Sequence, residues 1–170
     1  MAWQPDFEKL VDEHQAMVFS LALRMTGDRG LAEEIAQDVF LELDGNLGKL
    51  ASPEHARAWL RSVTMSRSTD ALRRRRVRRM DLWVELDEQH GRSAEDRGSP
   101  LATRIEQLLA TLPEAQRAAL ILRYQEDMLP EEIAAMLQTP VATVKSQLQR
   151  GLRLLRAKAA SHLKEYLRGI

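Results

Sequence analysis

Apolar residues recur every three or four positions along most of this chain, and no other feature of the sequence constrains the fold as strongly. This spacing places them on one face of an α-helix, which has about 3.6 residues per turn. The strict apolar-polar alternation of a half-buried β-strand is not found in the sequence. Leu and Ala are abundant, and both favour helix over sheet. The sequence therefore predicts an all-α protein.

Two helices are predicted near the start of the chain. The first has apolar positions at helical spacing from Phe7 to Met25, with Pro5 as a starting residue and Gly27 as a stop. The second runs from about Arg29 to Leu43, and Gly45 lies beyond its end. Each helix has one apolar face, so we expect the two to pack together.

A third helix is predicted from the sequence Ser52-Pro53-Glu54, which supplies a cap, a first-turn proline and a first-turn acid. It continues into Arg73–Arg79, where six of seven residues are arginines. Cations at a helix end also suit the macrodipole, so a solvated helix end is the alternative. The number of arginines favours nucleic-acid binding. The inward positions of this helix are Ala56, Trp59, Leu60 and Val63.

The helical spacing is lost between about residues 81 and 100, which are acidic and contain Gly, Ser and Pro. This composition predicts a flexible linker. We therefore predict two small helical domains, at residues 1–80 and 101–170, joined by the linker 81–100.

The second half is predicted to be helical again. A short helix contains Ile105, Leu108, Leu109 and Leu112, and Thr111 to Glu114 has the spacing of a capping box. Pro130 opens a further helix, and a tight turn at 138–140 precedes the last one. This pair fits a helix-turn-helix, although a plain helical hairpin with a solvated basic face remains open. The last helix is expected to expose Thr143, Lys145, Ser146, Gln149, Arg150 and Arg153.

The net charge of zero hides a strongly uneven distribution. Residues 1–50 have a net charge of −6, residues 51–80 of +7, residues 81–100 of −4 and residues 101–170 of +3. An acidic segment beside a basic block indicates at least two kinds of partner.

The sequence contains no motif typical of catalysis or metal binding. The chain lacks cysteine, which excludes disulfides and thiolate chemistry, and its four histidines are scattered. The acids Glu33, Glu34, Asp38 and Glu42 crowd one helix without a histidine at ligand spacing, so a solvated or partner-binding face is favoured over acid-base work. We predict no enzyme activity, cofactor, metal or small-molecule substrate. With no bilayer-length apolar run and no signal-peptide pattern, we expect a cytoplasmic protein.

Taken together, these motifs resemble the extracytoplasmic-function sigma factors, the shortest class of the bacterial primary-sigma family, over nearly the whole chain. The matching residues of the first half are Ala32–Leu41, Ala58–Leu60 and onward to Asp70, and Leu72–Arg74. Those of the second half are Leu112–Pro113, Arg117, Leu120, Glu132–Ala134, Thr143–Ser146, Leu148 and Arg150.

The resemblance implies a transcription initiation factor that brings RNA polymerase core to promoter DNA and helps to melt it, with an anti-sigma protein as regulator. It implies docking on the polymerase through Glu33, Glu34, Gln37, Asp38 and Leu41. It implies recognition of the minus-ten element by Ser66, Arg67, Asp70, Arg73, Arg74, Arg75 and Arg76. The minus-thirty-five element would be read by Thr143, Lys145, Ser146, Gln147, Gln149 and Arg150.

The chain departs from the family pattern at a few positions. Ser66 stands in place of a usual asparagine, Gln138 and Ala142 in place of glycines, and Gln147 in place of an arginine. These departures concern promoter sequence and duplex affinity. Two other functions remain open: a stand-alone helix-turn-helix regulator, usually a dimer on two half-sites, and a sigma mimic that only titrates an anti-sigma protein. The mimic would not need the arginine block.

Overall fold

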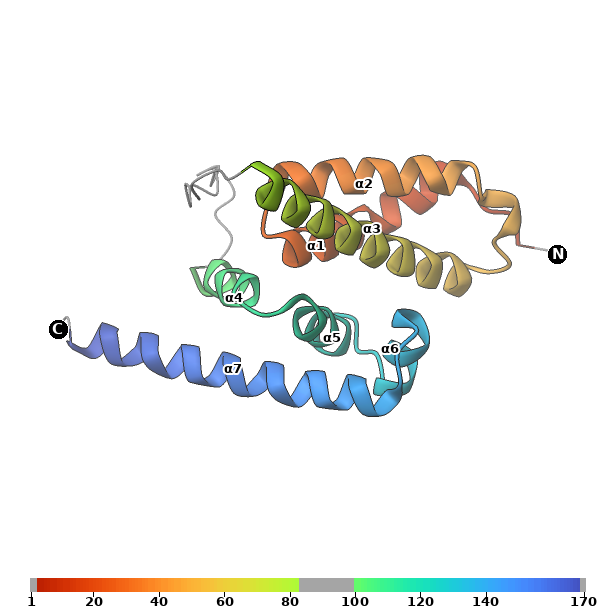
Figure 1. Cartoon of the computed structure of the whole chain (residues 1–170). Helices are drawn as coiled ribbons and strands as arrows, with labels where there is room; N and C mark the ends of the chain where they lie inside the picture. The colour runs from red at the N-terminus through yellow and green to blue at the C-terminus, as the bar shows by residue number, and fades with distance from the viewer. Residues whose placement is uncertain (1–2, 83–99, 169–170) are drawn as a thin grey trace. The chain divides into compact units, whose positions relative to one another are not determined.

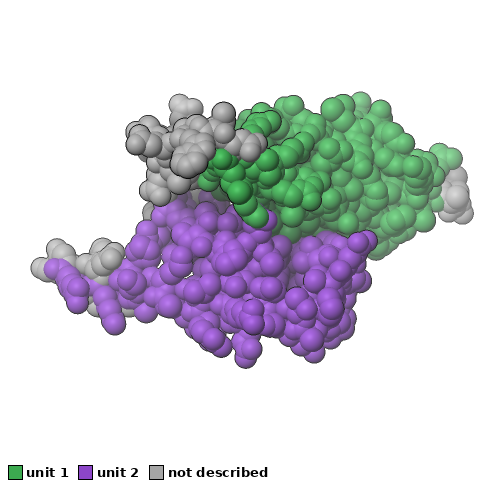
Figure 2. Space-filling model, viewed as in Figure 1, with its two compact units in different colours: residues 1–96 green, residues 97–170 purple. Residues whose placement is uncertain are grey.

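The computed structural model describes residues 3–82 and 100–168. Within these ranges the chain forms seven α-helices and one 3-10 turn, with no β-strand, which confirms the predicted all-α fold. The chain divides into two compact units, Met1–Asp96 and Arg97–Ile170 (Figure 2). None of the helices in the described ranges combines the length and apolar character needed to cross a bilayer.

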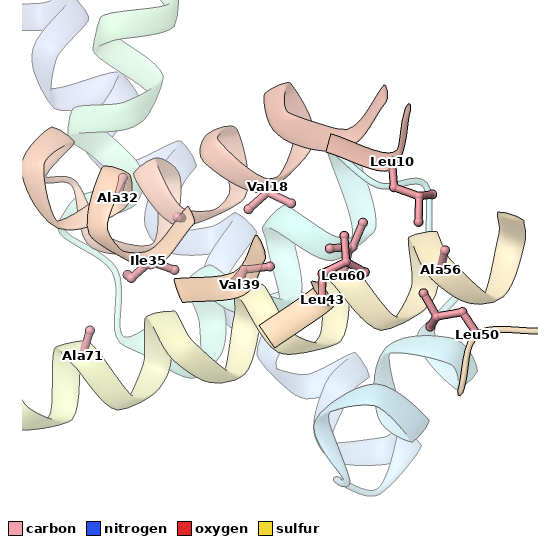
Figure 3. Close-up of a cluster of buried hydrophobic side chains, with 11 residues drawn as sticks. Leu10, Val18, Ala32, Ile35, Val39, Leu43, Leu50, Ala56, Leu60 and Ala71 are labelled. Carbon is pink, nitrogen blue, oxygen red and sulfur yellow. The ribbon is translucent and has the colours of Figure 1, made fainter. Parts of the chain in front are cut away.

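The first unit is a bundle of α1 (Phe7–Thr26), α2 (Arg29–Asp44) and α3 (Pro53–Leu82), with the short 3-10 turn η1 (Leu47–Lys49) before α3 (Figure 1). Each of the three helices packs against the other two. Their apolar stripes meet in one core (Figure 3). Trp59, a predicted inward position, is partly buried and packs against this core. The buried members of this core are Leu10, Val18, Ala22, Ala32, Ile35, Val39, Leu43, Leu50, Ala56, Leu60 and Ala71.

Short polar side chains set the helix boundaries of this unit. Pro5 does not start α1, because Asp6 is its N-cap and accepts a hydrogen bond from the Lys9 amide at 3.3 Å. Gly27 ends α1 in the left-handed conformation (φ 66°), as predicted. The expected cap at Ser52 is also present, since its Oγ accepts a hydrogen bond from the His55 amide at 3.1 Å.

The arginine block lies within α3, which continues without a break to Leu82. Asp81 and Leu82, which the prediction assigned to the linker, are therefore helical. Its last residue, Pro100, is the first residue of α4 rather than linker. A first-turn proline suits a helix start because its missing N–H would have no partner there. The rest of the predicted linker, 83–99, lies outside the described residues.

The second unit contains α4 (Pro100–Ala110), α5 (Glu114–Tyr124), α6 (Pro130–Leu137) and α7 (Val141–Arg168). The two helices α6 and α7, joined by a tight turn, form the predicted helix-turn-helix, and α7 also packs against α4 and α5 (Figure 1). At Gly151 the approach of α7 to α5 is close: a Cβ there would lie 2.8 Å from Leu120 Cδ1. Glycine therefore permits this packing.

The predicted capping box at the start of α5 is wrong. The Thr111 hydroxyl instead donates to the Leu108 carbonyl at 2.6 Å, and α5 begins without a side-chain cap. The turn is held by buried Arg117, whose Nη2 donates to the carbonyls of Ala110 and Leu112, both at 2.9 Å. A capping contact occurs at α6, where the Glu132 carboxylate accepts from the Leu129 amide at 2.6 Å.

The turn between α6 and α7 forces an unusual backbone conformation on Gln138. This residue is the C-cap of α6 and has left-handed dihedrals, φ 52° and ψ 45°. A left-handed residue with a Cβ costs roughly 1–2 kcal/mol, a cost that glycine avoids. A glycine, which the resemblance noted above would place at this position, would adopt this backbone without strain, whereas Gln138 carries strain.

We predict that Gln138→Gly raises the unfolding free energy of the protein by about 1 kcal/mol, because it relieves this strain. Urea unfolding followed by circular dichroism measures the change. Gln138→Ala is the control, since alanine keeps the Cβ and should bring no gain. Equal stability of the glycine variant and the wild type would contradict the argument.

Candidate functional site

A groove between α1 and α2 is the first candidate interface of the first unit. It has a volume of about 890 Å³. Phe7, Val11 and Phe19 of α1 and Phe40 of α2 contribute aromatic and aliphatic surface to it, and polar side chains such as Glu33 also line it. An apolar groove with polar residues at its rim is typical of a protein-binding surface.

All of the side chains predicted to bind a polymerase lie exposed on α2. Glu33, Gln37 and Leu41 line the groove, while Glu34 and Asp38 occupy the neighbouring exposed face of the helix. Leu41 is 73% exposed although it is large and apolar. An exposed leucine beside an apolar groove adds to the apolar surface that a partner could remove from water.

Sequence reasoning missed the contribution of α1 to this groove. Phe7 and Phe19 pack partly against the core, and together with Val11 they also line the groove. At one end of the groove, the Arg29 guanidinium lies 5.4 Å from the Phe19 ring centroid and 3.1 Å from Glu33 Oε1. The available signal was an apolar pattern on α1 wider than one packing stripe.

The arginines of α3 form the second candidate interface. Ser66, Arg73, Arg74 and Arg76 are exposed, whereas Asp70 is partly buried. Asp70 Oδ1 accepts a hydrogen bond from Arg73 Nη2 at 2.8 Å. Exposed guanidinium groups on one long helix suit a phosphate backbone, because each group can donate two parallel hydrogen bonds.

Two of the predicted DNA-binding arginines are instead bound to acids of the same unit. Arg67 donates from Nε and Nη2 to Glu42 Oε2, at 3.2 and 2.6 Å. Arg75 donates from Nη2 to Asp28 Oδ2 at 2.5 Å. Their side chains are 40% and 31% exposed, respectively. The arginines of α3 therefore divide into exposed ones and two, Arg67 and Arg75, that join α3 to α2.

Asp28 has two structural roles at once. As the N-cap of α2 it accepts a hydrogen bond from the Leu31 amide at 2.9 Å, and its other oxygen holds Arg75. Burial alone raises the pKa of the Asp28 carboxyl, but the Leu31 amide and the Arg75 guanidinium outweigh this and hold the pKa below its usual value. The sequence contained a cap residue at this position but no sign of the ion pair.

The third candidate interface is the first half of α7. Lys145, Gln149 and Arg150 are exposed, and Val144 is 2% exposed and points into the unit. The other three predicted DNA-binding residues of this helix are only partly exposed: Thr143, Ser146 and Gln147.

An acid that sequence reasoning missed lies beside this surface. Glu131 of α6 is exposed, and its Oε1 lies 3.8 Å from Lys145 Nζ. At this distance in water the two charges attract each other weakly. Across the described ranges, no group of three or more His, Asp or Glu side chains is arranged to hold a metal ion.

Two family models match the chain, one in each unit. The model of sigma-70 region 2 matches residues 10–78, which contain α2 and most of α1 and α3. The model of sigma-70 region 4 matches residues 102–155, which contain the helix-turn-helix. All three candidate interfaces fall within these ranges, apart from Phe7 at the edge of the groove.

Curated proteins show the same likeness over the length of this chain. The extracytoplasmic-function sigma factor SigE of Mycolicibacterium smegmatis is 32% identical over 96% of the chain, and the match covers 65% of SigE. The probable sigma factor RfaY of Xanthomonas campestris is 28% identical, with 43% of its length covered. SigW of Bacillus subtilis is 25% identical, with 88% of its length covered.

Solved structures show the same fold. The sigma factor RpoE of Bartonella quintana, in complex with the anti-sigma factor NepR, matches with a TM-score of 0.74 and 21% identity, over 89% of this chain and 95% of that one. CnrH, in complex with the cytosolic domain of CnrY, matches with a TM-score of 0.64 and 22% identity, over 91% and 88%.

The ion pair of Asp28 leads to a prediction about acid stability. A carboxyl with a depressed folded-state pKa stabilises the fold above its unfolded pKa, and this stability is lost as pH falls through the folded pKa. We predict that Asp28→Asn, which keeps a cap, removes this loss below about pH 4 and costs at most about 1 kcal/mol at pH 7. Asp28→Ala removes the cap as well and should cost about 0.5–2 kcal/mol more.

Urea unfolding of the wild type and both variants at several pH values measures these differences. The same acid dependence in Asp28→Asn and in the wild type would show that the carboxylate does not hold Arg75 in solution.

Proposed function

Since the chain belongs to the sigma-70 family, in its class of extracytoplasmic-function sigma factors, we propose that it directs bacterial RNA polymerase core to specific promoters and helps to melt them. The observation that carries this proposal is the presence of three different interfaces on one chain: an apolar groove with acids, an arginine-rich helix and a helix-turn-helix. A factor that must bind a polymerase, a melted strand and a duplex needs all three.

The α1–α2 groove is the proposed polymerase-docking surface. Its exposed Leu41 and aromatic side chains supply area that docking would remove from water. The acids Glu33, Glu34 and Asp38 would guide the approach of a basic surface, because charges at a rim mainly affect association rate and register.

The exposed arginines of α3 are the proposed contacts to the minus-ten region. Melted strands are held by a basic surface that follows the backbone. Arg73, Arg74 and Arg76 can supply such contacts without reading sequence. Ser66 is exposed about two helical turns before Arg73, where it can contact the bases of the melted strand.

The helix-turn-helix is the proposed reader of the minus-thirty-five element. The exposed side chains of α7 come from its first three turns, the part of a recognition helix that enters the major groove. A lysine or arginine there can bind phosphate or guanine, and a glutamine favours adenine. The proposed mechanism involves no covalent chemistry. The protein is proposed to act in the cytoplasm.

An anti-sigma protein is the proposed regulator. RpoE and CnrH, which share this fold, are each seen in complex with another protein, and NepR is described as an anti-sigma factor. An anti-sigma protein that covered the exposed apolar groove would also prevent polymerase docking there.

Run-off transcription with core polymerase on a promoter library tests the proposal as a whole. The expected result is initiation at a defined set of promoters only when protein and core are both present. Tight, sequence-specific duplex binding by the free protein, with no effect on core, would identify a stand-alone regulator. Anti-sigma binding without initiation would identify a mimic.

We predict that Glu34→Lys with Asp38→Lys lowers affinity for core polymerase and leaves helicity unchanged. Both acids are exposed on the helix that lines the groove, so reversing them opposes a basic partner. A pull-down titration at several salt concentrations measures the effect. Asp44→Lys, an exposed acid at the end of α2, is the matched control. Unchanged affinity in the double variant would remove this face from the docking surface.

We predict that Arg73→Ala with Arg74→Ala reduces promoter melting while polymerase binding persists. Because each arginine that binds a phosphate of a single strand displaces counterions, removing one should flatten the salt dependence of binding by about 0.7 in slope. Permanganate reactivity of the melted region, at several salt concentrations, measures both effects. A normal footprint would mean that these arginines only solvate a helix end.

We predict that Lys145→Ala and Arg150→Ala weaken use of the minus-thirty-five element, because neither variant can bind phosphate or guanine at that position. Gln147→Arg should strengthen it, and Glu131→Gln should strengthen it modestly by freeing Lys145. Transcription from promoters randomised only in this element compares the variants. The same selected sequences and efficiency for all of them would show that α7 does not read DNA.

A further inference from the structure

Two ion pairs join α2 to α3, and they lie at opposite ends of α2. Asp28, the N-cap of α2, holds Arg75, and Glu42 in the last turn holds Arg67. The order is antiparallel, since the earlier acid binds the later arginine. The polymerase-facing residues of α2 lie between the two acids in sequence, and the exposed arginines of α3 adjoin Arg75.

In both ion pairs, hydrogen bonds fix the geometry of the carboxylate and the guanidinium. Glu42 Oε2 accepts two hydrogen bonds from Arg67, and the pKa of the Arg67 guanidinium is raised by that contact. The Asp28 carboxylate is oriented by the Leu31 amide before it meets Arg75. A carboxylate fixed in this way loses little side-chain entropy when it binds the guanidinium.

We propose that Asp28 and Glu42 are positioning residues, which orient the arginine-rich helix α3 on α2 for promoter melting, and that Arg67 and Arg75 serve this purpose rather than contact phosphate. The inference rests on the proposed function of α3. It assigns a role in melting to two acids that would otherwise oppose DNA binding.

The direction in which Glu42→Gln changes DNA affinity and promoter melting distinguishes this proposal from a purely electrostatic role of Arg67. If Arg67 were a phosphate ligand, Glu42→Gln would free it and raise affinity for promoter DNA. If Glu42 positions α3, the same substitution should lower the rate of promoter melting although it removes a negative charge. Asp28→Asn should act in the same direction as Glu42→Gln, because asparagine keeps the cap and loses only the ion pair.

The experiment uses the full chain with core polymerase on a promoter that the wild type selects from the run-off library. It compares Glu42→Gln, Arg67→Gln, Asp28→Asn and the charge-swapped pair Glu42→Arg with Arg67→Glu. Asp44→Asn is the control for loss of an exposed acid on α2, and Arg74→Gln is the control for loss of an exposed arginine on α3. Core affinity, the affinity of the protein–core complex for promoter DNA, and permanganate reactivity are measured separately, well below the unfolding temperature of every variant.

Each single substitution in the pairs should slow melting about two- to fivefold, the range expected for partly exposed ion pairs, with core affinity unchanged. The charge-swapped pair should recover most of the rate. Arg74→Gln should instead lower the salt dependence, and Asp44→Asn should have no effect.

Increased DNA affinity in Glu42→Gln, or no recovery in the charge-swapped pair while the wild type melts the promoter, overturns the inference alone. If the slower promoter melting of a variant disappears when cooling restores its helicity, the ion pairs only stabilise the fold. That result also overturns the inference. A wild type that does not melt any promoter with core overturns the proposed function, and this inference with it.

Discussion

Burial of one apolar stripe from each of three helices is the interaction on which the first unit depends. Val18 of α1, Val39 of α2 and Leu60 of α3 are completely buried in the shared core. Burying a side chain of this size stabilises the fold by about 1.5–3 kcal/mol. Because α2 turns its stripe inward, Glu33, Glu34, Asp38 and Leu41 face outward, so the proposed docking surface follows from the core.

Charged side chains add a second set of contacts between the packed helices α2 and α3. The hydrophobic effect itself has no preferred direction. The pairs Asp28–Arg75 and Glu42–Arg67 add directional contacts across this seam. The acidic start of the chain and its basic block therefore have two functions: some members face outward to partners, and others neutralise each other within the unit.

In the second unit, backbone geometry rather than charge limits the choice of residues. Gly151 lets α7 approach α5, and Arg117 satisfies two carbonyls in the turn between α4 and α5. Gln138, which ends α6 in the left-handed conformation, carries backbone strain. These features hold the recognition helix against its support, so its exposed side chains project together from one surface.

The sequence by itself determined the helical class, the order of the helices, the helix-turn-helix, and the outward position of Glu33, Glu34 and Asp38 on α2, but not the pairing of Glu42 with Arg67. Each of these depends on local spacing and capping, which residues close in sequence specify. It did not determine the groove between α1 and α2, or which arginines of α3 are exposed and which pair with acids. Those depend on which helix faces lie against each other across 25 and 47 positions of chain, as in Glu42–Arg67 and Asp28–Arg75. Arginine looks the same in a sequence whether it meets solvent or a carboxylate, and only the tertiary packing of α2 against α3 decides between them.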